Sequence, residues 1–235
     1  MTAHKEFRRQ FVSFGFLKLN PEWRRLSAAE KAEHRGEFLE TVQHWAQPDT
    51  MKVLSYSTIG MRADCDMLLW RICYSLDCLQ EMSASLRRTQ LGSYLAAAHS
   101  YLGMTRRSIY EMGENERHAH LAGGVVKPGE HKYLFVYPLV RTRNWYQLPF
   151  EERQRMIHEL TKIHEEFARI QVNIIYSFGL DSQDYIIANE TNHPEECLER
   201  YMRLREASAG AFVQSDTPIF SCVQDSLQNV LEKLG

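Results

Sequence analysis

Apolar and aromatic residues form two strand-like runs, one in each half of the chain. The runs are 11–19 (FVSFGFLKL) and 133–140 (YLFVYPLV), and both are rich in aromatic and β-branched residues. A turn and a helix opening follow each run. Ser27 and Glu30 have the spacing of a capping box, and Pro149 suits the first turn of a helix. Each half therefore begins with a predicted strand and a predicted helix.

In the second of these helices, apolar residues recur at three- and four-residue spacing, which predicts one buried face. They are Met156, Leu160, Ile163 and Phe167. Each half continues with a strand pair around a glycine-containing turn, a basic amphipathic helix and a last strand. The predicted pairs are 52–58 with 66–74 and 171–178 with 184–190, the helices are 79–89 and 194–209, and the last strands are 99–110 and 218–223. The order strand, helix, strand, strand, helix, strand predicts the ferredoxin-like arrangement twice.

The two halves also repeat each other in sequence. YSTIGM at 56–61 corresponds to YSFGLD at 176–181, and upstream Trp23 aligns with Trp145 at a constant offset of 122 residues. A period that halves the chain indicates a duplicated unit. We therefore expect an α+β fold of tandem ferredoxin-like repeats that pack as one duplicated domain.

The segment between the halves has no counterpart in the first copy. Residues 111–131 are rich in glycine, charge and histidine. They form either a solvated linker or a flap over a site, since long irregular segments in compact domains often serve as lids. The predicted organisation is a first half at 1–110, this linker or flap, and a second half at 132–235.

Composition and charge exclude several classes of protein. The 235 residues are 44% hydrophobic and 25% charged, as in an ordinary globular protein. A net charge of -2 predicts no nucleic-acid partner, and no apolar run is long enough to predict a membrane span. The first residues lack the apolar core of a signal peptide, and five scattered cysteines without a Cys-x-x-Cys pair fit a reducing compartment. We expect a cytoplasmic protein.

Longer motifs in both halves resemble the chlorite dismutase superfamily, which includes the coprohaem decarboxylases. The second half carries KYLFVYPLVRTRNWYQLPFEERQRM, YSFGLD and SDTPIFSC, and the first half carries VLSYSTIGMRADCD, LQEMSASLRRTQLG and HSYLGMTRRSIY. The resemblance covers nearly the whole chain, with the motifs in the family's order. It implies a dimeric α+β barrel within one chain, a homopentamer, and haem b or coprohaem, both containing iron, as the cofactor in the C-terminal half.

The resemblance also implies roles for residues near the Tyr-Pro pair. Tyr137 matches the tyrosine whose radical abstracts hydrogen from a coprohaem propionate, and Trp145 matches the tryptophan beside the haem. Arg141 and Arg143 are expected to hold propionates, because guanidinium groups bind carboxylates through two hydrogen bonds. Arg205 is a further cofactor-binding candidate. Without the resemblance, Tyr137 is a packed strand aromatic and the first two arginines are exposed.

The helix after EERQR departs from the family pattern. Relatives carry an axial histidine five positions after the last arginine of this run, and counted from Arg155 that position is Leu160, which has no donor atom for iron. The carboxylate that orients the axial imidazole in relatives corresponds to Ser208. His164 lies one turn after Leu160, about 40° around the helix. It is the candidate iron ligand, provided that the porphyrin is displaced by about one helical turn of 5–6 Å.

The opposite side of the cofactor also differs from chlorite-splitting relatives. These place an arginine on the strand before the YSFGLD turn, where this chain has Val172, so we expect no chlorite dismutation. His120 is a candidate base for peroxide cleavage, with His118 beside it, because an imidazole accepts protons near neutral pH. The alternative is that these histidines belong to a loop without a catalytic duty.

The sequence is therefore compatible with three hypotheses about function, each of a different class. The first is a haem- or coprohaem-binding oxidoreductase that uses hydrogen peroxide, centred on Tyr137. The second is a barrel without conventional haem ligation that binds another tetrapyrrole or organic ligand, or acts as an assembly partner; Leu160 and Ser208 favour it. The third, a cofactor-free oxygenase, is suggested only by related ferredoxin-like barrels.

Overall fold

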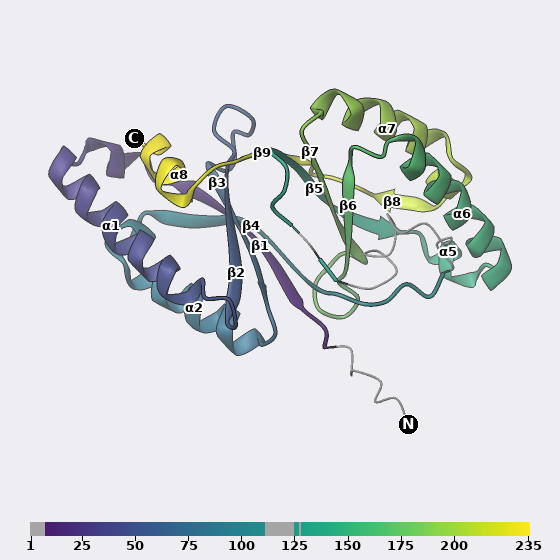
Figure 1. Cartoon of the computed structure of the whole chain (residues 1–235), viewed down its shortest axis with the longest axis horizontal. Coiled ribbons are helices and arrows are strands. Elements are labelled where there is room, and N and C mark those ends of the chain that lie inside the picture. Colours follow the sequence, from purple (N-terminus) through teal and green to yellow (C-terminus); the bar gives the residue numbers. More distant parts are fainter. Residues whose placement is uncertain (1–7, 111–124, 127) are drawn as a thin grey trace.

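The computed structural model shows two lobes that share one sheet (Figure 1). It describes residues 8–110, 125–126 and 128–235. Helices α1 and α2 cover one end of the molecule, α6 and α7 cover the other, and the strands lie between them (Figure 1). Within the described residues, none of the helices combines the length and apolar character needed to span a bilayer.

The N-terminal lobe contains the first four strands and the helices between them. Its elements are β1 (Phe11–Leu19), η1 (Pro21–Arg25), α1 (Ala28–Trp45), β2 (Met51–Ser57), β3 (Met67–Cys73), α2 (Leu76–Arg88), α3 (Gln90–Ser93) and β4 (Leu95–Met104). Helix α1 begins at the predicted capping box: the Glu30 amide donates to Ser27 Oγ at 3.3 Å, and the Ser27 amide donates to Glu30 Oε2 at 2.8 Å. Two of the orphan amide groups of the first turn are thereby satisfied.

The C-terminal lobe repeats this order with extra elements near its end. They are β5 (Tyr133–Arg141), α5 (Arg143–Gln147), α6 (Phe150–Glu166), β6 (Gln171–Tyr176), β7 (Tyr185–Thr191), α7 (Pro194–Glu206), η3 (Ser208–Phe212), β8 (Val213–Ser215), β9 (Phe220–Gln224) and α8 (Leu227–Lys233). The turns after β2 and β6 use glycine at a positive φ, 79° at Gly60 and 71° at Gly179. Glycine adopts this conformation without steric cost, so the repeated motif encodes the same turn twice.

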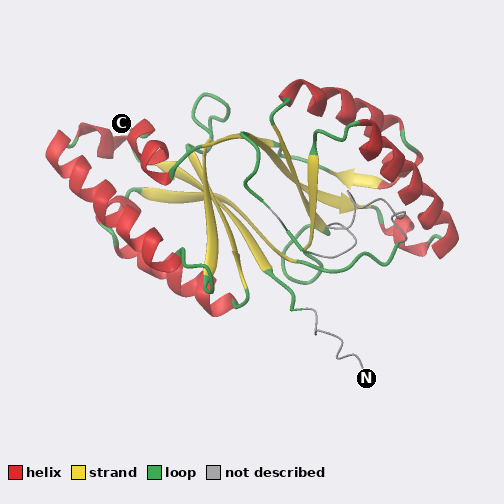
Figure 2. Cartoon of the chain, in the orientation of Figure 1, coloured by secondary structure: helices red, strands yellow, loops and turns green. Residues whose placement is uncertain are grey.

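The strands of the two lobes close into one ring (Figure 2). The order is β4-β1-β3-β2 in the N-terminal lobe and β9-β5-β7-β6 in the C-terminal lobe, which is the ferredoxin-like order in both. The lobes join where β2 pairs with β9 and where β4 pairs with β6. The predicted α+β fold of tandem ferredoxin-like repeats is confirmed.

Element ends differ from the prediction where the local sequence is ambiguous. The last strand of the N-terminal lobe was predicted at 99–110, but β4 is Leu95–Met104 and pairs with β1 along its length. Alanines at 96–98 have little strand propensity, so only the pairing with β1 makes this segment a strand. Helix α7 ends at Glu206, three residues before the predicted end, and a 3-10 turn follows.

The interior of the ring is a solid apolar core built by both lobes. Alternate residues of β1, such as Phe14 and Phe16, point into it, and β5 contributes Val136. Phe16 stacks on Phe220 of β9 with ring centroids 3.9 Å apart. The residues between these positions on each strand therefore face the helices.

A carboxyl group is also enclosed in this interior. Glu190 of β7 is fully buried, and it accepts hydrogen bonds from the Gly129 amide at 2.6 Å and from Asn173 Nδ2 at 2.9 Å. Burial raises the pKa of Glu190 to about 7, and the two hydrogen bonds oppose the rise. Because Gly129 precedes β5, its hydrogen bond to Glu190 connects the segment before β5 to strand β7.

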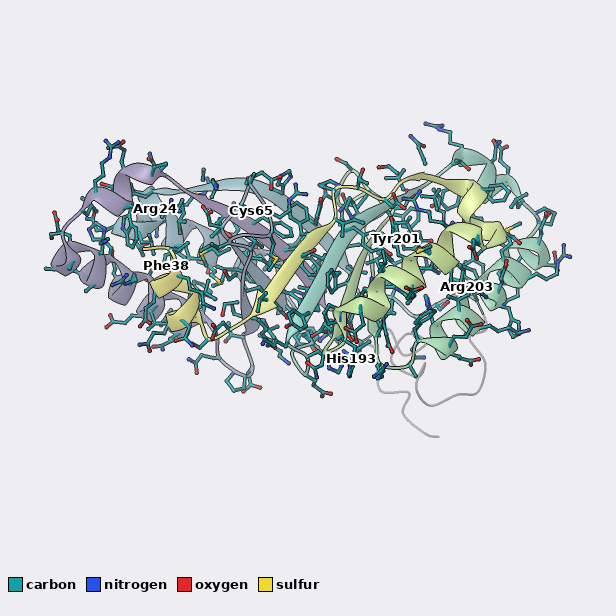
Figure 3. All side chains as sticks on the ribbon, turned by 90° about the horizontal axis from the view of Figure 1, so that it is seen from above. Arg24, Phe38, Cys65, His193, Tyr201 and Arg203 are labelled. Carbon is teal, nitrogen blue, oxygen red and sulfur yellow. The ribbon has the colours of Figure 1, made fainter. Side chains whose placement is uncertain are left out.

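The layers between sheet and helices differ greatly in the two lobes. The buried apolar cluster of this layer has fifteen residues in the N-terminal lobe and four in the C-terminal lobe. Part of the difference is α8, which crosses to the N-terminal lobe and packs Val230 and Leu231 near Phe38 of α1 (Figure 3). In the C-terminal lobe, no described helix fills the corresponding space in this way.

Candidate functional site

A cavity occupies the sheet–helix layer of the C-terminal lobe. It measures about 1210 Å³, including open space at its mouth, and lies between β5–β7 and the helices α6 and α7. Its walls are largely apolar, with Leu139, Ile157, Ile174 and Leu204 among the lining residues. Sites for organic ligands typically have mostly apolar walls with a few polar groups that fix the orientation of the ligand. The lining of this cavity is therefore that of a site for an organic ligand.

Tyr137 lies on the floor of this cavity, in the middle of β5. It alternates with the inward-facing Val136, so its side chain faces the helices. The ring is 5% exposed and meets Tyr201 of α7 edge to face, with centroids 5.8 Å apart. Burial raises the pKa of the Tyr137 phenol, and the charge of Arg200 opposes the rise. At the matching place on β1 stands Gly15.

Arg200 of α7 is a buried cation in the cavity wall. It is 2% exposed, and its guanidinium donates to His164 Nδ1 from Nη2 at 2.9 Å and from Nε at 3.2 Å. Its Nη1 donates to Asn189 Oδ1 at 3.3 Å. Burial lowers the pKa of Arg200, although an arginine stays protonated at physiological pH. No carboxylate among the described residues pairs with this charge.

A second buried cation, Arg141, lines the cavity near the end of β5. It is 8% exposed, its Nη1 donates to the Ala209 carbonyl at 2.6 Å, and its guanidinium lies 4.5 Å from the ring centroid of Trp145. Stacking on the indole stabilises the cation without neutralising it. Within the described part of the chain, no carboxylate forms an ion pair with Arg141. Burial lowers its pKa.

The remaining charges of the cavity neutralise each other. Arg205 Nη2 lies 3.0 Å from Asp216, and Tyr201 donates its hydroxyl to the same carboxylate at 2.6 Å. The lining thus holds two uncompensated buried guanidiniums beside one neutralised pair. Because an unpaired buried charge is costly, this arrangement fits a ligand that brings its own carboxylates.

The α6 wall of the cavity offers no ready iron ligand. Leu160 is half-buried and lines the cavity, and its side chain has no donor atom. His164, one turn later, also lines the cavity, as the helical spacing predicted. Its Nδ1 accepts from Arg200, which can only donate, so the neutral imidazole carries its proton on Nε2. A metal needs an unprotonated ring nitrogen, and neither nitrogen of His164 offers a free lone pair in this arrangement.

The other predicted site residues occupy different environments. Trp145 and Val172 are buried in the cavity lining, whereas Arg143 is exposed on α5 and lies outside it. Ser208 is exposed, and its amide donates to Glu159 Oε2 at 3.0 Å. The candidate base His120, like its neighbour at 118, lies outside the described residues.

The sequence prediction missed Arg200, Tyr201 and Asp216. A signal for the first was present, because Cys197, Arg200, Tyr201 and Leu204 have the spacing of one helix face. A lone arginine within such a face is a candidate for a buried cation. Only the fold shows that this face meets His164.

The residues of this cavity thus fit the carboxylates of a haem-type cofactor but not its iron. Its two guanidiniums that form no ion pair with a carboxylate of the described residues fit the carboxylates of such a group. Leu160 and the Arg200-bound His164 do not fit its iron. Among the described residues there is also no cluster of three or more histidine, cysteine or acidic side chains suited to a metal ion.

Comparisons with known proteins agree on one family. The sequence profile of the chlorite dismutase family matches residues 27–225. A coproheme decarboxylase from Mycolicibacterium smegmatis is 31% identical over 180 residues, which cover 76% of this chain and 75% of that protein. A mutant chlorite dismutase from Candidatus Nitrospira defluvii superposes with a TM-score of 0.86 at 21% identity, covering 95% of this chain and 94% of the other. The same enzyme in complex with imidazole gives 0.86 at 20% identity, with the same coverage.

Proposed function

We propose a function for the C-terminal cavity from one premise: this chain belongs to the chlorite dismutase family. The cavity binds a carboxylate-bearing tetrapyrrole of the haem or coprohaem class. The apolar walls contact the faces of the macrocycle, and the buried cations hold its propionates.

One observation supports this proposal above all others. Arg141 and Arg200 are both at least nine-tenths buried, both line the same cavity, and neither is paired with a carboxylate of the described chain. Burying a cation costs several kcal/mol unless a partner compensates. A ligand with several carboxylates on an apolar body supplies the missing partners, and coprohaem carries more carboxylates than haem b.

A second candidate function is peroxide-dependent oxidation of the bound coprohaem, as in a coprohaem decarboxylase. Its support is Tyr137, a buried phenol on the cavity floor whose pKa is influenced by the charge of Arg200. A propionate held by Arg200 would lie beside this phenol. Bound iron would supply the oxidation chemistry, and Tyr137 is the residue of this chain placed to act on the substrate. Hydrogen peroxide as oxidant and a homopentameric assembly belong to this candidate as predictions.

Chlorite dismutation is not proposed. At the position where chlorite-splitting relatives carry an arginine, this chain has Val172, which is 4% exposed and packs with Ile170 and Ile187. The cation suited to hold an oxyanion is therefore replaced by an apolar wall.

A binding titration with a cavity-filling variant tests the proposal. Coprohaem and haem are added separately to the protein, and the Soret absorption is followed. We expect saturable binding to the native chain and its loss in Leu160→Trp, because the indole fills space lined by Leu160. Leu198→Trp is the matched control, since Leu198 is 64% exposed on the outer side of α7. Equal binding by both variants, or no binding by the native chain, would refute the proposal.

A further inference from the structure

The contact between Arg200 and His164 determines which imidazole tautomer the cavity contains. Both Nε and Nη2 of Arg200 lie within 3.2 Å of His164 Nδ1. A guanidinium has donors and no acceptor, so Nδ1 must present its lone pair to Arg200. The proton of the neutral imidazole is then on Nε2.

This tautomer is the reverse of the one that metal ligation requires. A histidine that binds iron through one nitrogen normally donates a proton from the other nitrogen to a carboxylate or carbonyl. At His164 the nitrogen on the Arg200 side accepts instead of donating. Binding iron through Nε2 would require either an anionic imidazolate or rupture of the contact with a buried guanidinium. Charge-assisted hydrogen bonds are about twice as strong as neutral ones, so the rupture is disfavoured.

Three tyrosines of the cavity lining, Tyr137, Tyr185 and Tyr201, do not replace this ligand. Tyr201 donates its proton to Asp216, which also pairs with Arg205. Burial raises the phenol pKa of Tyr137 and of Tyr185, so both stay protonated at neutral pH. A protonated phenol is a poor ligand for iron, since haem proteins with a tyrosine ligand use the ionised form.

From this geometry we propose that the cavity selects its tetrapyrrole by the carboxylates and not by the metal. Arg200 has two roles in this proposal. It binds a propionate, and it holds His164 in the tautomer that does not bind iron. The iron-free macrocycle, its zinc complex and its iron complex then bind alike. This inference rests on the proposed function, because it concerns the ligand of the same cavity.

The hydrogen bonds that Arg200 already makes do not prevent it from binding a propionate. Its bonds to His164 and Asn189 use one N–H each from Nε, Nη1 and Nη2. A guanidinium has five N–H groups, and a further one of them contacts the Tyr137 phenol, so one N–H group stays available for a carboxylate. The same side chain can therefore retain His164 and bind a propionate at once.

Titrations with three forms of one macrocycle test the proposal. Metal-free coproporphyrin, zinc coproporphyrin and coprohaem are titrated into the full-length chain, and binding is followed by quenching of tryptophan emission, since Trp145 lines the cavity. We expect the three dissociation constants to agree within about threefold. Leu160→His serves as the positive control: it places an imidazole where relatives carry the axial histidine, and should make the iron form bind best, with a histidine-type ferrous spectrum.

A second measurement reads the tautomer directly and needs no ligand. In ¹⁵N-labelled protein, the nitrogen shifts of His164 should show an unprotonated Nδ1 and a protonated Nε2. In Arg200→Met the guanidinium is removed, and we expect the two tautomers to mix. His164→Ala should change the binding of all three macrocycles by the same factor, within about threefold, because no metal bond is lost.

The outcomes separate this inference from the proposed function. If none of the three macrocycles binds, the proposed function fails and this inference falls with it. If coprohaem binds at least about tenfold more tightly than the metal-free form, the tetrapyrrole site stands and metal-independent selection is refuted. A histidine-type or tyrosinate-type iron spectrum in the native chain, or a protonated Nδ1 at His164, would also refute it.

Discussion

Replacing Arg141 while leaving Arg143 as its control tests the role of the buried cations. The two arginines are close in sequence but differ in surroundings: Arg141 is 8% exposed and lines the cavity, whereas Arg143 is exposed outside it. Methionine retains an apolar stem of similar length and removes the charge at either position. We therefore compare Arg141→Met with Arg143→Met.

The expected loss follows from the interactions of a guanidinium with a carboxylate. A hydrogen bond to a charged group contributes about 1.5–3 kcal/mol. At 1.4 kcal/mol for each tenfold change in affinity, Arg141→Met should weaken coproporphyrin binding by about 10- to 100-fold. Arg143→Met should leave the dissociation constant within about twofold, because an exposed charge outside the cavity contributes little.

Fluorescence titration measures both constants, and thermal unfolding controls for damage to the fold. Arg141 also donates to the Ala209 carbonyl and stacks on Trp145, so its removal can loosen the turn after α7. Arg141→Lys is a second variant that retains the charge but loses the two-pronged geometry, and it should fall between the native chain and Arg141→Met. Equal dissociation constants for Arg141→Met and Arg143→Met, in folded proteins, would refute the assignment of propionate binding to Arg141.

Other predictions concern stability and chemistry. The pKa of Glu190 is about 7 against an ordinary 4.5, so the folded chain binds an extra proton between these values and the unfolding free energy should fall by up to about 3 kcal/mol as pH rises from 4.5 to 7. Glu190→Gln should remove this fall in denaturant titrations at several pH values, and an unchanged slope would contradict it. Ser27→Ala, which removes the capping box of α1, should cost about 1 kcal/mol and lower the melting temperature. If the chain decarboxylates coprohaem with peroxide, Tyr137→Phe should abolish carbon dioxide release measured by mass loss while binding persists; continued release would exclude Tyr137 from the chemistry.

The sequence predicted most of the fold because its patterns are local. The aromatic and β-branched run at 11–19 is a strand over its whole length, and the capping box at Ser27 opens α1 where expected. The element ends that differ, such as the start of β4 at Leu95, depend on pairing with β1 and not on local propensity. Helix α8 was not predicted, and its packing on the opposite lobe is a tertiary event that no periodicity encodes.

The sequence predicted only those site residues that lie at positions matching the motifs of the family. Tyr137, Trp145 and Leu160 line the cavity, and their places follow from strand alternation and helix spacing. Arg200 was missed because a basic residue on an amphipathic helix usually faces solvent, and its contact with His164 joins positions on two helices. The decisive property of the site, that Nδ1 of His164 accepts from Arg200, therefore arises from a pair of residues that sequence spacing does not connect.

A crystal structure of the native chain with bound coprohaem tests the central claim most directly. We expect the macrocycle in the C-terminal cavity, with propionates on Arg141 and Arg200 and with no bond from His164 to iron. The contact between Arg200 and His164 Nδ1 should persist. A macrocycle bound elsewhere, or iron bonded to His164 with Arg200 displaced, would contradict the account.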